Sequence, residues 1–257
     1  MKMQDRFYGD AATVNVDISD GEVNRYVAKV FGWMFIGLMI TCLSTVGIIT
    51  GINISDAFAD TIAMLSRVVL PIFLVQVFLV GFISARVAKM NPATAIVLYA
   101  VYAAVNGFTI GLFALLYVGS AQVIAAAFGV TALSFGIMAF YGMVTKSDLT
   151  KAGNLLKMGL IGVFIVMVVN IFLRSSALEF LICIVGLFVF LGLTAYDTKK
   201  IKTQYAPAAL YGTGEVGGIG QQALASNLAI AGALALYLDF LNMFMFILRL
   251  FGGGGRR

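Results

Sequence analysis

The sequence of 257 residues is 61% hydrophobic and 11% charged, and its mean hydropathy is +1.00. Soluble domains are usually about 45–50% apolar and about 25% charged, so this composition excludes an ordinary soluble protein. The net charge of +5 does not predict nucleic-acid binding, because the basic residues are spread over the connections between apolar runs. The absence of histidine argues against zinc sites and histidine-based catalysis.

The apolar runs are about 20 residues long, which is the length of a transmembrane helix rather than of a barrel strand. They predict an all-α, polytopic membrane protein with seven transmembrane helices. In chain order the predicted spans are Val30–Gly51, Val68–Val87, Pro92–Tyr117, Ala121–Val144, Leu155–Leu173, Leu178–Thr198 and Ala223–Leu250. The chain then divides into a mobile cytoplasmic tail at 1–29, a seven-helix domain at 30–251 and a flexible tail at 252–257. A glycine-rich stretch between residues 205 and 222 predicts a flexible connection before the last span.

Basic residues predict the orientation in the membrane. They gather in the amino-terminal tail and in the second, fourth and sixth connections, whereas the opposite connections contain only Arg67 and Arg174. Because cytoplasmic loops carry the excess of Lys and Arg, the amino terminus is predicted to face the cytoplasm. Seven spans would place the carboxyl terminus outside, yet Arg256 and Arg257 are basic, so the side of that terminus stays open.

The last span contains an acid, Asp239, in the middle of an apolar run. A carboxylate at the bilayer centre costs about 2.5–3.5 kcal/mol on insertion scales, so it is more often functional than incidental. On a 3.6-residue period Gly232, Asp239 and Asn242 fall on or near one face, and small residues favour close helix packing. We expect the seventh helix to lie at the centre of the bundle. A polar stripe on a central helix suits a buried pathway; the alternative is that these polar residues only hold the bundle together by hydrogen bonds.

A second acid, Asp197, ends the sixth span. It reaches Asp239 only if the sixth helix continues past Asp197 to Ile201 and the seventh begins in the cytoplasm. Two acids in contact would share a proton and titrate in two separated steps, which makes a pH switch without histidine. In the ionised form, Asp197 and Asp239 are also a candidate transient site for Ca²⁺, a hard cation that prefers oxygen ligands.

Arg86 and Arg249 are the candidate partners of this pair. Arg86 ends the second span on the predicted cytoplasmic side, where it would either latch to Asp197 or act as a positive-inside anchor. Arg249 lies about 15 Å along the helix from Asp239, so direct pairing is excluded and an interfacial position is the simplest interpretation. Asn242 and Arg249 complete the predicted polar network of the last span.

Several motifs resemble those of the Bax-inhibitor family, the transmembrane Bax inhibitor motif proteins. They are LYLDFLNMF at Leu236–Phe244 followed by Leu248 and Arg249, YDTKKI at Tyr196–Ile201, GFT at Gly107–Thr109 and TKSDL at Thr145–Leu149. The resemblance implies six helices around a central seventh and a pH-sensitive calcium leak. It also implies that Asp197 and Asp239 form a di-aspartyl proton sensor, with a latching arginine at or beside Arg86.

The main functional hypothesis is therefore a proton-gated cation leak in a bacterial inner membrane, not an enzyme, with no cofactor and with Ca²⁺ as the permeating ion. Its expected partners are the lipid bilayer, Ca²⁺, protons and other membrane proteins. One alternative is an intramembrane aspartyl protease, although Tyr237 and Leu238 stand where such proteases place glycines before the second acid. Another alternative is a non-conducting regulator of other membrane proteins.

Overall fold

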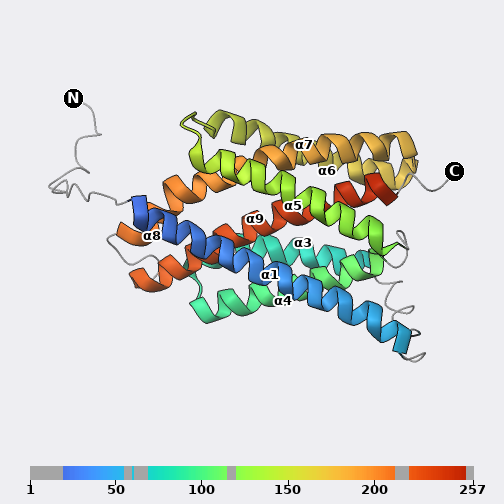
Figure 1. The fold of residues 1–257 in the computed structure, drawn as a ribbon, viewed down its shortest axis with the longest axis horizontal. Coiled ribbons are helices and arrows are strands. Elements are labelled where there is room, and N and C mark those ends of the chain that lie inside the picture. Colours follow the sequence, from blue (N-terminus) through green and yellow to red (C-terminus); the bar gives the residue numbers. More distant parts are fainter. Residues whose placement is uncertain (1–19, 55–59, 61–68, 115–119, 212–219, 253–257) are drawn as a thin grey trace.

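The computed structural model describes residues 20–54, 60, 69–114, 120–211 and 220–252, and within these ranges it contains helices and no β-strand. The long helices lie side by side as one bundle (Figure 1). They are α1 (Asp20–Ile54), α3 (Val69–Arg86), α4 (Pro92–Phe113), α5 (Ala121–Val144), α6 (Thr150–Leu173), α7 (Ser176–Lys200) and α9 (Gln221–Gly252). Shorter segments are η1 (Val87–Lys89), η3 (Ile201–Tyr205) and α8 (Ala206–Tyr211). The predicted all-α membrane fold is confirmed.

The long helices match the thickness of a bilayer. Among the described residues, six helical segments have the length and hydropathy to cross a membrane: Asp20–Gly51, Pro92–Phe113, Ala121–Val144, Thr150–Leu173, Ser176–Leu210 and Gln221–Gly252. α3 is not among these six; its 18 residues lie within the predicted second span and form about 27 Å of helix, close to the thickness of the hydrocarbon core.

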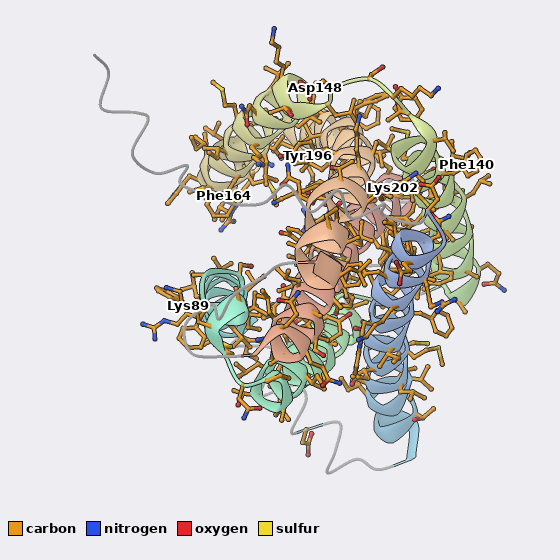
Figure 2. All side chains as sticks on the ribbon, turned by 90° about the vertical axis from the view of Figure 1, so that its left-hand side faces the viewer. Lys89, Phe140, Asp148, Phe164, Tyr196 and Lys202 are labelled. Atoms are coloured by element: carbon orange, nitrogen blue, oxygen red, sulfur yellow. The ribbon has the colours of Figure 1, made fainter. Side chains whose placement is uncertain are left out.

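The central position of α9 is also confirmed. In its most apolar window 72% of the residues are buried within the protein, compared with 6% in α6 and 39% in α7. α9 packs against α1, α4, α5 and α7. The peripheral helices instead expose large apolar side chains, such as Phe140 of α5, which lies at the outer edge of the bundle (Figure 2). The bundle is therefore apolar on the outside as well as inside, as a lipid-facing surface requires.

Some helices are longer than the sequence predicts. α1 begins at Asp20 rather than Val30, so residues 20–29 belong to a helix and not to the predicted tail. Tyr26 and Val27 are buried there, and this tertiary packing supports helix in a stretch that is too polar to be recognised as a span. Within the predicted flexible connection, α8 is likewise helical. Residues 1–19, 212–219 and 253–257 lie outside the described residues.

One end of the bundle collects most of the described basic residues. α1 and α9 begin at this end, and α3, α5 and α7 finish there (Figure 1). Viewed from that end, Lys89, Tyr196 and Lys202 lie at three different parts of the bundle (Figure 2). The other end has Arg174 and Arg249, from the ends of α6 and α9.

Candidate functional site

Asp239 lies in the core of the bundle, on the central helix α9. Only 3% of its surface is exposed, and among the described residues its Oδ2 atom has no hydrogen-bond partner. Its neighbours along the chain, Leu236, Phe240 and Met243, are buried as well. A buried polar atom without a partner is costly, so a proton, a water molecule or a cation is expected to satisfy it.

A second contact fixes how α9 is rotated. Tyr237, on the face of α9 opposite to Asp239, is completely buried, and its hydroxyl lies 2.7 Å from the Thr41 hydroxyl of α1. Tyr99 and Tyr102 of α4 pack edge-on against the Tyr237 ring. Because two residues along a helix differ by about 200°, holding Tyr237 against α1 and α4 directs Asp239 away from them.

Asp239 therefore faces the end of α7, which carries Asp197. On α9, Gly232 lies on the same face as Asp239, and a Cβ atom at Gly232 would be 3.1 Å from both the Ile201 and the Val30 side chains, so at this level the face lies against η3 and the first part of α1. On α7 and its continuation, Ile201 follows Asp197 by one helical turn. The two helices run in opposite directions, so the contact at Gly232 and Ile201 brings the two acids to within about one turn of each other along the bundle axis.

The electrostatics of the two acids agree with this geometry. Asp197 is close enough for its negative charge to disfavour a second negative charge on Asp239. Asp239 is buried, and Asp197 is half-buried. The sixth helix does continue past Asp197, as the pairing required, because α7 runs to Lys200 and passes directly into the π-helix η3. The structure thus brings together the two acids that the sequence singled out, and we call them the acidic pair.

Two lysines lie near Asp197, the less buried acid of the pair, and neither was predicted as a site residue. Lys200 and Lys157 are the cations whose charges act on Asp197. The Lys157 ammonium of α6 lies 4.9 Å from the centre of the Tyr196 ring and 3.4 Å from its hydroxyl. Lys200 follows Asp197 by three residues, a spacing that places both on one helix face and could have revealed it. Lys157 comes from another helix, so only the tertiary structure reveals its position.

The other predicted network residues lie elsewhere. The Arg86 guanidinium lies 5.7 Å from the Phe82 ring centre, and among the described residues no ion pair joins it to Asp197. The Arg249 guanidinium lies over the Phe113 ring at 5.5 Å. Asn242 donates to the Leu238 carbonyl of its own helix at 2.8 Å. Among the described residues none of these three side chains is hydrogen-bonded or ion-paired to the acidic pair, although Asn242 lies about one turn from Asp239 on α9. The Arg86 latch stays a prediction.

The described residues contain no group of three or more His, Cys, Asp or Glu that could hold a metal ion. Calcium takes six to eight oxygen ligands, and two carboxylates supply only part of such a set. A cation at the acidic pair would need water and backbone carbonyls to complete its shell. The donor set suits a passing ion better than a resident one.

The comparison with known families agrees with this architecture. A family model described as "Inhibitor of apoptosis-promoting Bax1" matches residues 23–256, which is nearly the whole chain. The chain belongs to this family.

Proteins from several bacteria are similar to the chain over most of its length. The inner membrane protein YbhL of Escherichia coli is 36% identical over 231 residues, which cover 90% of this chain and 92% of YbhL. A protein of Rickettsia prowazekii is 36% identical over 91% of both chains. A protein of Deinococcus radiodurans is 37% identical over 89% of this chain and 90% of its own length. The family resemblance stated from the motifs is confirmed.

Proposed function

We propose that this member of the Bax1-inhibitor family is a pH-sensitive leak pathway for Ca²⁺ in a bacterial inner membrane, with Asp197 and Asp239 as proton sensor and gate. The observation that carries the proposal is Asp239 itself. It is a buried acid on the central helix, one of its oxygens has no hydrogen-bond partner among the described residues, and a second acid lies near it. Membrane-embedded acids of this kind mark ion and proton pathways in transport proteins.

The proposed gate depends on how many protons the pair holds. With one shared proton, a carboxyl group donates to a carboxylate, and this short hydrogen bond joins α7 to α9. Without the proton, the two carboxylates would repel each other, by on the order of a few kcal/mol for neighbouring charges at an effective dielectric constant of about 20. Loss of the proton would therefore push the ends of α7 and α9 apart and leave two negative oxygens to attract a cation.

Lys157 and Lys200 make the two acids unequal in this proposal. Both cations act on Asp197, whereas the charge that acts on Asp239 is that of Asp197. Because a nearby cation favours a carboxylate and a nearby carboxylate opposes a second one, the shared proton belongs mainly on Asp239. The buried member of the pair would then be the group that gains and loses the proton.

The location follows from the relative and from the basic residues. YbhL is described as an inner membrane protein, and the described part of this chain has six helices long and apolar enough to cross a membrane. The excess of Lys at one end of the bundle supports a cytoplasmic position for that end and for the start of α1. The acidic pair would then lie nearer to the cytoplasm than to the other side.

The protease alternative is less well supported by the surroundings of Asp239. Tyr237 and Leu238 precede the acid, and Tyr237 is fully buried and in contact with Thr41. An intramembrane aspartyl protease needs room beside the second acid for the substrate backbone. Tyr237 and Leu238 therefore do not provide the open backbone that glycines before the second acid would give. The non-conducting regulator is distinguished by the experiment below.

The test is calcium flux through the purified protein in liposomes, measured against pH with a trapped fluorescent indicator. We expect flux from the wild type to depend on pH. The Asp239→Asn variant should vary by less than about twofold across about pH 5–8, because the second acid of the coupled titration is missing. Asp197→Asn should also remove the coupled step, since either acid alone titrates as a single group.

Asp148→Asn is the matched control. Asp148 is an exposed acid at the same end of the bundle, near the start of α6, and asparagine can still accept the hydrogen bond that Asp148 receives from Thr150. This variant should keep the wild-type pH response. A protein that folds but conducts no Ca²⁺ would contradict the leak and favour a regulator. A wild-type pH response in Asp239→Asn would remove the acidic pair from the gate.

A further inference from the structure

A cavity of about 510 Å³ lies between α3, η1 and α4, away from the acidic pair. α3 and α4 run in opposite directions and form its two sides, and the short connection between them closes its end. Its lining includes Phe82, Arg86, Lys89, Met90, Thr94 and Leu98. Residues 82 and 86, like 94 and 98, are one helical turn apart, so each helix contributes a single face.

The charge of the cavity is positive and uncompensated. Arg86 and Lys89 are both exposed, and no Asp or Glu lines the cavity. In the part of the chain that the structure describes, neither cation forms an ion pair, and Arg86 instead lies over the Phe82 ring. α4 also begins at Pro92, beside the cavity, and the start of a helix carries partial positive charge. The cavity is therefore suited to an anion.

The apolar part of the lining lies on one side of these charges. Phe82 and Leu98 are one turn, about 6 Å, further along the bundle axis than Arg86 and Thr94. Phe82 is 49% exposed although it is a large apolar side chain. This order of groups, cationic at the end of the span and apolar deeper in it, matches the phosphate and the acyl chains of a membrane lipid.

The position of the cavity in the bundle also favours a lipid. Lys89 lies at the outer edge of the bundle, at the end where the basic residues gather (Figure 2). α3 packs against α4 and η1, and its face beside the cavity is directed away from the central helix. A lipid in the bilayer could reach the cavity by moving sideways, without entering the protein.

The cavity wall is connected to the central helix by one buried hydrogen bond. The side-chain amide of Asn227 on α9 donates to the Met90 carbonyl at 2.7 Å, and Asn227 is fully buried. Met90 lines the cavity, and Asn227 lies on the same helix as Asp239. A ligand that orders the connection between α3 and α4 would also restrain the first turns of α9.

We propose that this cavity is a binding site for an anionic phospholipid of the leaflet at the basic end of the bundle. Arg86 and Lys89 bind the phosphate group, and Phe82 and Leu98 contact the acyl chains. The bound lipid holds the connection between α3 and α4 against α9 through Asn227. This site is independent of the proposed function, since lipid binding is expected whether or not the protein conducts ions.

The test is native mass spectrometry of the purified full chain with phosphatidylglycerol and, separately, with phosphatidylcholine. We expect the wild type to retain phosphatidylglycerol selectively. Lys89→Gln should weaken its binding about fivefold, and the double variant Arg86→Gln, Lys89→Gln roughly twenty-five-fold, since each basic residue near the surface contributes a similar factor. Both side chains are exposed, so these variants should fold normally, which thermal unfolding will verify.

The matched control is the double variant Lys146→Gln, Lys151→Gln, which removes two exposed lysines from the same end of the bundle but outside the cavity. It should bind phosphatidylglycerol like the wild type. Equal losses in the control and cavity variants would overturn the proposal, because they would indicate general charge attraction. Equal retention of phosphatidylcholine would also overturn it. Displacement of the lipid by inorganic phosphate alone would show an anion site without a lipid requirement and would overturn it too.

Discussion

At the scale of single residues, Tyr237 and Asp239 lie on opposite faces of α9 and differ in how their polar atoms are hydrogen-bonded. Tyr237 is fixed by the Thr41 hydroxyl and by two tyrosine rings, so its side of the helix is held rigidly. Within the described residues Asp239 has an oxygen without a hydrogen-bond partner, so no side-chain hydrogen bond like that of Tyr237 holds this oxygen. Any movement of α9 that depends on protonation should therefore begin on the side of Asp239, where the polar atoms are unsatisfied.

Asp148, outside the membrane spans, provides a prediction about pH. The Thr150 hydroxyl and backbone amide donate to its carboxylate, and these hydrogen bonds hold the pKa of Asp148 below its ordinary value. Because the folded-state pKa is the lower one, the hydrogen bonds contribute stability above the unfolded-state pKa. That contribution is lost as the pH falls through the folded-state pKa.

The measurement is carbon NMR of the Asp148 carboxyl group during an acid titration, assigned with the Asp148→Asn variant. Its midpoint should lie below that of the same residue in a short peptide of residues 145–150. The start of α6 should fray at pH values below this midpoint and remain helical above it. A midpoint equal to that of the peptide would show that the Thr150 hydrogen bonds are absent in solution.

At the scale of helices, the absence of a side chain at Gly142 of α5 allows the backbones of α5 and α7 to pack closely. A Cβ atom at Gly142 of α5 would collide with the Ala195 carbonyl oxygen and would lie 3.0 Å from the Thr198 Cβ atom. Ala195 and Thr198 are backbone neighbours of Asp197, and Thr198 is fully buried. The position of Asp197 therefore depends on the absence of a side chain on the facing helix.

The Gly142→Ala variant should lose about 1–3 kcal/mol of stability, because the backbones of α5 and α7 must separate to accept the methyl group. The measurement is thermal unfolding in detergent, followed by circular dichroism. Gly136→Ala on the same helix is the control, since a Cβ atom there meets nothing within 4 Å. The control should be neutral or gain up to about 1 kcal/mol from the higher helix propensity of alanine. Equal stability of the two variants would mean that the α5–α7 contact is looser than described.

At the scale of the whole molecule, the described ends of the bundle differ in charge and in the chain termini they carry. α1 begins at the basic end, and α9 finishes at the opposite end (Figure 1). From the sequence alone, the side of the membrane on which the carboxyl terminus lies was undetermined, because the tail contains basic residues. Because α1 begins and α9 finishes at opposite ends of the bundle, we expect the last turn of α9 to lie on the other side of the membrane from the first turn of α1.

Reporter fusions test this topology. Green fluorescent protein joined after Gly252 should be non-fluorescent and alkaline phosphatase at the same point active, because we expect α9 to end outside the cytoplasm. A fusion after Tyr211, at the basic end, should give the reverse pattern. Fluorescence from both fusions would contradict an odd number of crossings. The reverse of both patterns would instead invert the orientation of the whole bundle.

The sequence by itself determined the membrane class and the approximate spans, and it singled out the two acids of the proposed sensor. A run of about 20 apolar residues has one stable solution in a bilayer, the helix, so span positions follow from composition. The cost of an acid in hydrocarbon distinguished Asp239 in the same way, without any knowledge of its neighbours. Helix ends were less certain, and α1 begins earlier than predicted because tertiary contacts bury its first turns.

Only the tertiary structure decided which side chains meet. Periodicity assigns a residue to a face of its helix, but it does not reveal which other helix covers that face. The sequence therefore indicated no partner for Lys157, whose ammonium lies over the Tyr196 ring and whose charge acts on Asp197. Arg86 was matched to Asp197 because both were expected at the same end of the bundle, yet its helix packs against α4 and its guanidinium lies over Phe82. Two residues at the same end of a bundle are at a similar height along its axis, but they are in contact only if the helices that carry them are neighbours around that axis.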